Sequence, residues 1–249
     1  MNRPGTQGTH GKNSPHERSG AWTVAHAARA LATACDEWQR PLPRVGALVL
    51  GPESVTLRLT TPDEAPPPGW TAERFGRTWW IPLHELHGTP VSDRIAEPFP
   101  LLVSAGASTD GRVMLNLAEA GGLISLTGDP ALAHGMVRSW SRRLTTGPWA
   151  AGTRVIRVGF EPDADFTGWD ASRLVEVAHM LEAPEGGIVL FAARPQGRDL
   201  YLVDRLLEQA DRRWAVVAVD AENATWRLTV SMDGTIDTGL FAETLSMRP

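Results

Sequence analysis

One segment of the sequence combines residue types and spacing that could bind a phosphate group. Residues 123–127 form an apolar run, Gly128 and Asp129 follow it, and Pro130 opens a stretch with helical periodicity. A strand that passes through a glycine into a helix leaves backbone amides free where a phosphate binds, as in nucleotide-binding phosphate loops. The chemistry expected from such a loop is nucleotide binding or hydrolysis.

The same segment lacks the side chains that ATP hydrolysis requires. A working phosphate loop has Gly-Lys-Ser/Thr at the helix start, where the lysine neutralises phosphate charge and the hydroxyl holds magnesium. Lys12 is the only lysine of the chain and lies in a polar N-terminal segment. Asp129 is expected to cap the helix that Pro130 begins, which places negative charge where a phosphate would bind. We therefore expect a capped helix in an α/β scaffold and no ATP hydrolysis.

Other polar residues follow the apolar runs that read as parallel strands. Ligands of open parallel sheets bind beyond the carboxyl ends of the strands. The expected ligand-binding residues are Gly128, Asp129, Glu161, Arg194 and Asp220. Three carboxylates facing one arginine make a poor phosphate site, and no residue is assigned a catalytic role.

Two further groups of residues have a metal-binding composition but not the required spacing. His84 and His87 are three residues apart, whereas the helix of zinc proteases needs two histidines four apart. The acidic run 161–165 lacks the glycine and terminal glutamate of a calcium loop, and we interpret it as a solvated loop before a helix capped by Asp170. We expect neither a metal nor a cofactor.

Tryptophan supplies the best indication of a partner surface. Trp79 and Trp80 are adjacent in an expected strand, so alternation places one of them in the core and leaves the other exposed. With Trp70 they are the candidate interaction surface, and packing between domains is the alternative interpretation. Cys35 lies on the apolar stripe of an expected helix and is interpreted as a core residue.

Composition limits the partners and the compartment. The formal net charge is −5, and the arginines are spread along the chain, so nucleic-acid binding is not expected. A single cysteine excludes an intramolecular disulfide and fits a reducing compartment. The sequence has no stretch long enough to span a membrane and no signal peptide. We expect a cytoplasmic protein with a protein partner, and a homo-oligomer is compatible with the sequence. A soluble segment of a larger membrane-anchored protein remains an alternative.

The order of periodic segments predicts an α/β protein with two regions after a disordered tail of residues 1–20. Residues 21–120 are expected to hold a helix (22–38) followed by a mainly antiparallel sheet that includes a hairpin of residues 45–50 and 55–59. Residues 121–249 are expected to form a parallel sheet with intervening helices, closed by an antiparallel hairpin near the end. The expected parallel strands are 123–127, 155–159, 188–193 and 214–219, and the expected helices are 130–144, 171–181 and 199–210.

Several of these segments resemble a known group of bacterial proteins. Residues 123–132 read LISLTGDPAL, and Trp149 and the run RVIRVGF at 154–160 follow. They are similar to a segment of large bacterial membrane proteins that combine a LysM module with a bacterial transcriptional activator (BTAD) domain. They also resemble a degenerate FtsK/SpoIIIE-type ATPase domain of type VII secretion motors. This similarity extends over most of residues 22–245, but the sequence has no LysM module, activator domain or membrane helix.

Two functions remain open from the sequence. The preferred hypothesis is a non-catalytic module that binds a protein partner or senses a ligand, built on a degenerate nucleotide-binding fold without the phosphate-loop residues. The alternative is a small-molecule or nucleotide-binding domain whose site lies at the carboxyl ends of the parallel strands.

Overall fold

The computed structural model describes residues 15–149, 152–209 and 213–247, with side chains from residue 20 onward. The first helix, α1 (Pro15–Glu37), begins before the expected start at Trp22. Most of the expected disordered tail, residues 1–20, lies outside the described residues.

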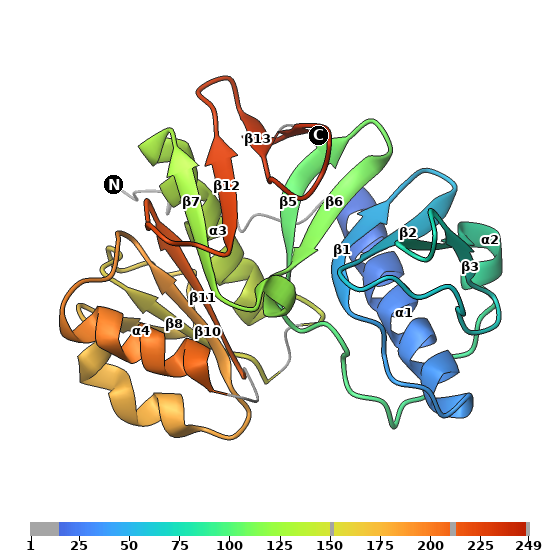
Figure 1. Cartoon of the computed structure of the whole chain (residues 1–249), viewed down its shortest axis with the longest axis horizontal. Helices are drawn as coiled ribbons and strands as arrows, with labels where there is room; N and C mark the ends of the chain where they lie inside the picture. The colour runs from blue at the N-terminus through green and yellow to red at the C-terminus, as the bar shows by residue number, and fades with distance from the viewer. Residues whose placement is uncertain (1–14, 150–151, 210–212, 248–249) are drawn as a thin grey trace, which may run out of the picture.

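Among the described residues, fourteen strands form one bent sheet (Figure 1). Their order across the sheet is β3-β4-β2-β1-β6-β5-β14-β13-β12-β7-β11-β10-β8-β9. The strands are β1 (Val45–Leu50), β2 (Ser54–Leu59), β3 (Thr71–Glu73), β4 (Thr78–Pro82), β5 (Leu102–Ser108), β6 (Gly111–Asn116), β7 (Leu123–Gly128), β8 (Arg154–Val158), β9 (Trp169–Ala171), β10 (Gly187–Phe191), β11 (Trp214–Val219), β12 (Trp226–Val230), β13 (Thr235–Asp237) and β14 (Leu245–Ser246). The helices after α1 are α2 (Leu83–Leu86), the 3₁₀ helix η1 (Leu117–Ala120), α3 (Pro130–Thr146), the 3₁₀ segment η2 (Leu174–Glu182) and α4 (Arg198–Glu208).

The parallel block consists of β12, β7, β11, β10, β8 and β9, each parallel to its neighbour. Its central strands β10 and β11 are buried at every position, because helices or loops cover both faces. In β12 the burial alternates, so one face of that strand meets solvent. The predicted α/β class, with parallel strands in the second half after a helix and antiparallel strands, is confirmed.

Two details of the second half differ from the sequence prediction. The expected helix at 171–181 is strand β9 followed by the irregular 3₁₀ segment η2, which has a kink at Val177. The expected terminal hairpin exists as β12 and β13, but β12 also pairs in parallel with β7 and so belongs to the parallel block. The apolar pattern of residues 171–181 did not distinguish a helix from a strand, because short apolar runs suit both.

The antiparallel block consists of the remaining strands, from β3 to β13 in the order given above. The predicted hairpin of β1 and β2 is confirmed, and β6 pairs with the other edge of β1. Beyond β5 the pairing thins out, since β14 pairs with β5 only at Ser246 and Ala107. Apart from Ala107, the edge of β5 that faces β14 therefore has no strand partner among the described residues.

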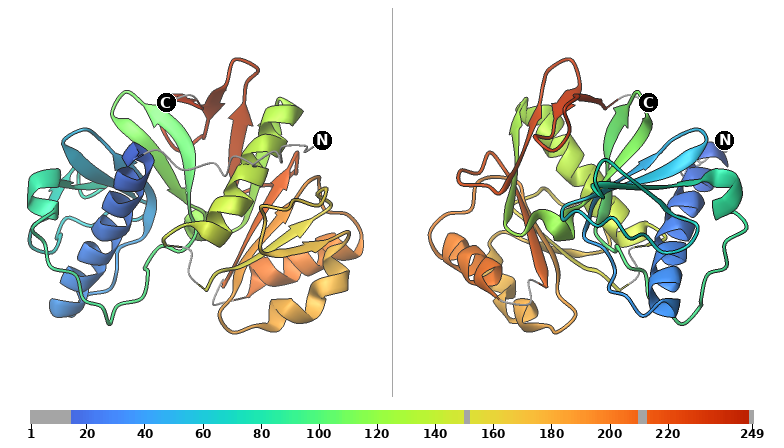
Figure 2. Two further views of the ribbon diagram at one scale, coloured as in Figure 1. Left: turned by 180° about the vertical axis from the view of Figure 1, so that it is seen from behind. Right: turned by 45° about the vertical axis from the view of Figure 1, so that its right-hand side comes forward.

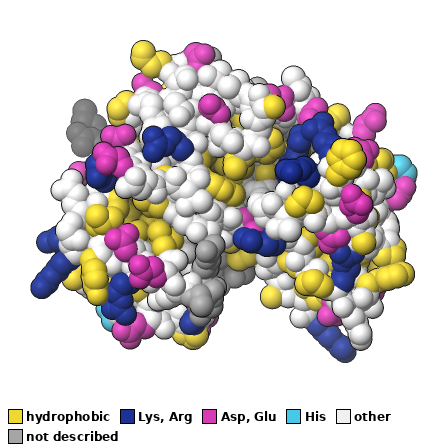
Figure 3. All heavy atoms as spheres, viewed as in Figure 1, with side chains coloured by type: hydrophobic (Ala, Val, Ile, Leu, Met, Phe, Trp, Pro, Cys, Tyr) yellow, Lys and Arg dark blue, Asp and Glu magenta, His cyan; other side chains and the backbone are white. Residues whose placement is uncertain are grey.

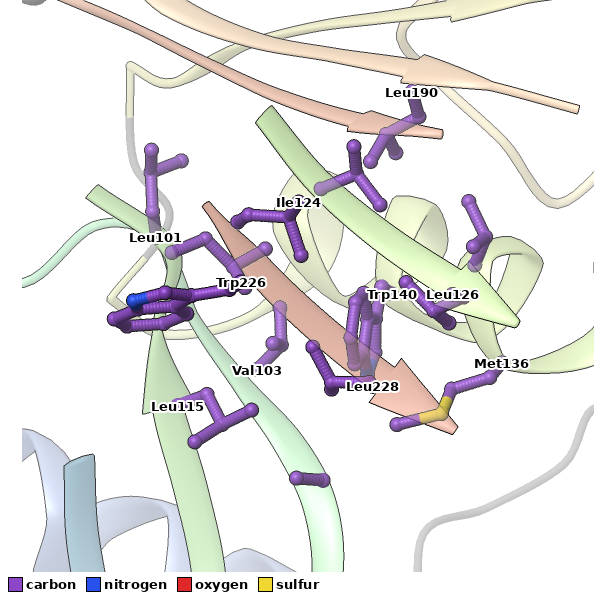
Figure 4. Packing of buried hydrophobic residues seen from close by; sticks show 14 of the residues in the cluster. Leu101, Val103, Leu115, Ile124, Leu126, Met136, Trp140, Leu190, Trp226 and Leu228 are labelled. Atoms are coloured by element: carbon purple, nitrogen blue, oxygen red, sulfur yellow. The ribbon is translucent and has the colours of Figure 1, made fainter. Parts of the chain in front are cut away.

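Buried apolar residues gather in three clusters, and the largest contains residues from both blocks. Within it, Trp226 of β12 points toward Val103 and Leu115 of the antiparallel block, and Trp140 of α3 lies beside Leu228 (Figure 4). The two expected regions, 21–120 and 121–249, thus share one core. The second cluster lies between α1 and the antiparallel strands and includes Cys35, which is buried as predicted.

The front face of the molecule carries arginines and carboxylates side by side over both halves (Figure 3). No large field of one sign is visible on this face. None of the helices in the described ranges is both long enough and apolar enough to cross a membrane.

Candidate functional site between the two helices

The expected ligand-binding residues do lie along one edge of the sheet. Strands β7, β11, β10 and β8 are neighbours and run parallel, so the residues that follow their carboxyl ends share an edge. These residues include Asp129, Asp220, Arg194 and Glu161. Arg194, however, forms an ion pair with Glu222, with 2.6 Å between Nη1 and Oε1. Glu222 was not among the expected site residues.

The start of α3 is closed to a phosphate. The Asp129 carboxylate accepts a hydrogen bond from the Leu132 amide at 2.9 Å, and the Asp129 amide donates to the Val230 carbonyl at 2.8 Å. Gly128 has a φ of 98°, and a Cβ there would lie 2.1 Å from the Val230 oxygen. The predicted helix cap is confirmed, and the loop packs directly on the β12 backbone.

A buried arginine holds the segment that follows β8. The Arg157 side chain is fully buried, and its Nε and Nη2 atoms each donate to the Asp170 carboxylate at 2.7 Å. Its guanidinium carbon lies 3.8 Å from the centroid of the Phe166 ring. The Asp163 carboxylate lies 3.4 Å from Nη1 of the same arginine. One buried cation thus binds two carboxylates and an aromatic ring.

Asp163 ties this segment to α3. It accepts hydrogen bonds from Arg142 Nε and Nη2 at 2.9 and 3.0 Å. Burial raises the pKa of the Asp163 carboxyl, but hydrogen bonds from the Asp165 amide and Arg142, and the charges of Arg142 and Arg157, outweigh burial, so its pKa lies below the ordinary value.

The prediction that residues 161–165 form a solvated loop is therefore wrong for Asp163, whose carboxylate binds Arg142 and Arg157. The expected cap at Asp170 is also wrong, because Asp170 lies in β9 and pairs with Arg157.

The tryptophans expected at a partner surface are mostly in the core. Trp79 is fully buried and donates from Nε1 to the Asp63 carbonyl at 2.6 Å, and Trp70 is buried as well. Trp80 is half-buried and lines a shallow hollow beside Glu53. The predicted alternation holds, but a surface built on Trp70 and Trp79 is not accessible to a partner.

The histidines of the described residues belong to no group of metal ligands. His84 is exposed, and His87 lies against Trp22, whose ring is also stacked on His26. In the described ranges no three His, Cys, Asp or Glu residues are grouped so that they could hold a metal ion.

A pocket that the sequence did not indicate lies between α1 and α3. Seen from behind, both helices lie on the same side of the sheet, with β5 and β6 between them (Figure 2). The pocket has a volume of about 320 Å³ and is lined by residues of all four elements and of the C-terminal segment. Its position is the junction between the cluster under α1 and the cluster under α3.

Small residues on the two helices make the space. Gly20 and Ala21 line it from α1, and Gly135 and Ser139 line it from α3. A Cβ added at Gly135 would have no neighbouring atom within 4 Å. A glycine inside a helix costs about 1 kcal/mol relative to alanine, so Gly135 keeps the wall open at the expense of helix stability.

Two tryptophans form the apolar wall and hold the free edge of β5. Trp140 Nε1 donates to the Ser104 carbonyl at 2.8 Å, and Trp149 Nε1 donates to the Leu102 carbonyl at 2.9 Å. These indole groups replace a neighbouring strand as hydrogen-bond donors. The geometry of this wall is therefore fixed by hydrogen bonds as well as by packing.

Among the described residues that line the pocket, the charged ones are Arg112 and Arg143. An arginine remains protonated in proteins, so neither residue can act as a general base. Sequence reasoning missed this pocket because it joins residues more than 120 positions apart. Two signals were present, namely a glycine in the middle of a helix and an arginine two residues before Met114 in a mainly apolar strand.

Comparisons with known proteins do not assign the chain to a family. No protein-family model matches it, and no curated protein matches it. One solved structure with a similar arrangement is that of the pCW3 conjugation coupling protein TcpA, in its monomer form with ATPγS. The similarity has a TM-score of 0.38 at 10% identity and covers 92% of this chain and 93% of that one. Such a likeness carries no functional argument, and the resemblance to LysM and BTAD proteins stays a prediction.

Proposed function

We propose that this chain is a non-catalytic regulatory module that senses a small molecule in the pocket between α1 and α3 and acts on a protein partner. The observation that carries the proposal is the composition of the pocket. Its lining is mainly apolar, and among the described residues that form it there is no Asp, Glu, His, Lys, Cys or Tyr side chain to serve as a general acid or base. Such a site binds a ligand without turning it over.

The location of the pocket supports a regulatory role. A molecule bound there would contact α1, which packs on the antiparallel block, and α3, which packs on both the parallel block and β5. A ligand that binds only the folded state raises its stability, by an amount that grows with the logarithm of the ligand concentration above its Kd. A ligand at this junction would therefore strengthen the association of the two blocks, and a partner that contacts both would respond to it.

A neutral fluorescent probe, N-phenyl-1-naphthylamine, tests the pocket. We expect saturable binding to the full-length chain and loss of that binding in Gly135→Leu, whose side chain enters the pocket. Ala131→Leu is the matched control, because Ala131 is exposed on the same helix and does not line the pocket. Equal binding by the wild type and Gly135→Leu would refute the proposal.

The second candidate function is nucleotide or small-molecule binding at the carboxyl ends of the parallel strands. One observation favours it, since Asp220 and Arg194 follow the carboxyl ends of the neighbouring parallel strands β11 and β10. Thermal shifts with Mg-ATP, GTP and cyclic dinucleotides distinguish the two. A rise in melting temperature that Gly135→Leu retains would favour the strand ends.

A further inference from the structure

We propose that the sheet face around Trp80 is a docking surface for a proline-rich segment of a protein partner. This face lies on strands β2 and β4, and the hollows that line it share no residue with the pocket between α1 and α3. The inference therefore goes beyond the ligand site proposed above and does not rest on it. It is carried by hydrogen-bond donors that are buried on this face without a partner.

The register of β2 and β4 puts four side chains on one face of the sheet. Thr56 lies opposite Trp80, and Arg58 lies opposite Thr78. Residues directly opposite each other in antiparallel strands share a face, and neighbours along a strand alternate. The alternate residues belong to the core cluster under α1, namely Val55, Leu57, Trp79 and Ile81. The Trp80 face is therefore the face of the sheet that points away from α1.

Three polar atoms on this face are buried and have no hydrogen-bond partner among the described residues. They are Trp80 Nε1, Arg58 Nε and Thr78 Oγ1. Buried indole N–H groups and hydroxyls usually have a partner in folded proteins. The two nitrogen atoms can only donate, and the threonine hydroxyl can donate as well. This face of the sheet therefore lacks hydrogen-bond acceptors.

Other indole groups of the chain show that the Trp80 N–H is an exception. Four tryptophans donate from Nε1 to backbone carbonyl oxygens at 2.6 to 3.1 Å, namely Trp79, Trp140, Trp149 and Trp214. Trp80 is adjacent to Trp79 and half-buried, yet no acceptor from the described part of the chain reaches its N–H. A carbonyl oxygen from a bound partner would give Trp80 the acceptor that the other four indoles have.

Two adjoining hollows give a ligand room on this face. One hollow is lined by Trp80, and the other is lined by Thr56 and Arg58. Both are also lined by Glu53 and Ser54, so they meet at the turn between β1 and β2 and form one shallow groove. An extended ligand can span both hollows and lie against the indole ring.

Neither charge nor strand pairing selects a ligand in this groove. The Arg58 guanidinium lies 3.9 Å from the Asp110 carboxylate, and Glu53 lines the same groove, so the charges are of both signs. Strand β2 lies between β1 and β4 and pairs with both, so a peptide cannot be added to it as a further strand. Recognition is left to the side-chain donors and to the apolar surface of Trp80.

A polyproline II helix supplies what this groove lacks. Its backbone has no internal hydrogen bonds, so its carbonyl oxygens are free acceptors, and proline has no N–H donor of its own. Proline-rich segments dock in aromatic-lined grooves, and the helix is preformed, so little conformational entropy is lost on binding. A proline-rich segment therefore matches both the unpaired donors and the indole surface of Trp80.

Acetylated decaproline amide and a Gly-Ser peptide of the same length and end groups are matched probes, because they differ only in side chains and backbone preference. Isothermal titration of the full-length chain should show saturable binding of decaproline and none of the Gly-Ser peptide. Trp80→Phe keeps an aromatic ring and removes the N–H, so it should weaken decaproline binding about fivefold to tenfold, the worth of one net hydrogen bond. Trp38→Phe is the matched control, because Trp38 is exposed just after α1 and does not line the groove. It should leave the affinity unchanged.

The outcomes separate this inference from the proposed function. The melting temperature of Trp80→Phe should stay close to that of the wild type, because Nε1 has no partner among the described residues, so lost binding is not lost fold. No decaproline binding, equal binding of both peptides, or binding that Trp80→Phe leaves unchanged would overturn the docking surface. Decaproline binding that Gly135→Leu abolishes would place the peptide in the pocket and would overturn it too. Binding that Gly135→Leu retains supports the surface, whatever the result with N-phenyl-1-naphthylamine.

Discussion

The edge of the parallel sheet and the pocket between α1 and α3 are built in opposite ways. At the sheet edge, the polar groups that a ligand would use already have partners within the chain, as the Asp129 cap and the Arg194–Glu222 pair show. At the pocket, glycine and alanine leave space, and most of the described residues that line it are apolar. The sequence pattern that resembles a phosphate loop thus lies at the sheet edge, where the polar groups are already paired. The pocket has no such local motif.

This contrast shows why a local motif and a binding site need not coincide. The strand–loop–helix segment satisfies its own backbone amides, which stabilises the fold and removes the donors that a phosphate requires. The pocket is formed where two cores meet without complete packing. Substitutions confined to one region at a time test this difference.

The largest effect is expected from Arg157→Ala, which removes the cation that closes the segment after β8. Asp163 and Asp170 would lose a shared partner, and a cavity would form beside Phe166. Breaking a buried ion pair costs about 3 to 5 kcal/mol of unfolding free energy. Urea denaturation measures the loss.

Arg154→Ala is the control on the same strand. Arg154 is partly exposed and lies 3.8 Å from Glu185, so its loss should cost less than about 1 kcal/mol. Equal losses in the two variants would mean that the buried cation does not hold this region, and the closed character of the edge would need another explanation.

The next prediction compares a glycine-to-alanine substitution at the sheet edge with one at the pocket. Gly128→Ala should destabilise the protein by roughly 2 to 4 kcal/mol, because the residue has a positive φ and its Cβ would meet the Val230 carbonyl. Gly135→Ala should instead stabilise it by up to about 1 kcal/mol, because it improves helix propensity and meets open space. Thermal and urea unfolding of both variants give the signs.

If both variants change the free energy of unfolding in the same direction, the distinction between the two regions is wrong. If Gly135→Ala destabilises the protein, the space at α3 is not open in solution. If Gly128→Ala is neutral, the loop can move away from β12, and the start of α3 can become available to a ligand.

The sequence predicted those features that depend on neighbouring residues. The Asp129 cap, the β1–β2 hairpin and the central parallel strands all follow from spacing over a few positions. The position of β12 next to β7 was missed, because its alternation is also that of an antiparallel strand. Arg157 was missed for another reason: a charged residue in a strand reads as exposed, and burial depends on Asp163, Asp170 and Phe166 being brought to it.

The candidate site was predicted least well. Residues expected along the strand ends do share an edge, but the ones expected at a tryptophan surface are largely buried. The pocket joins Gly20 of α1 to Met247 near the end of the chain, so no window of sequence contains it. Only the sheet order, with β14 beside β5, brings those segments together.

A smaller effect is expected from Asp129→Ala. Loss of the hydrogen bond to the Leu132 amide should destabilise the protein by about 1 kcal/mol, and Asp129→Ser should retain most of the stability because serine also caps helices. Thermal unfolding measures both. Mg-ATP should not raise the melting temperature of Asp129→Ala. A rise would show that the side chain alone had kept a phosphate site closed.

The smallest effect concerns the loss of stability as the pH falls into the acidic range. The pKa of Asp163 is lower in the folded protein than the ordinary aspartate value of about 3.9. The unfolded chain therefore binds its proton first as the pH falls, so the stabilisation is complete above the unfolded pKa and is lost as the pH falls through the folded pKa. Urea unfolding between about pH 6 and pH 3 should show a steeper loss in the wild type than in Asp163→Asn.

Asp165→Asn provides the matched control, because the Asp165 side chain is exposed two residues away and its backbone amide still donates to Asp163. It should keep the wild-type slope. If Asp163→Asn has the same slope as the wild type, the carboxylate is not held by Arg142 and Arg157 in solution. The segment after β8 would then be free to leave α3, and the sheet edge would be open in the same sense as the pocket.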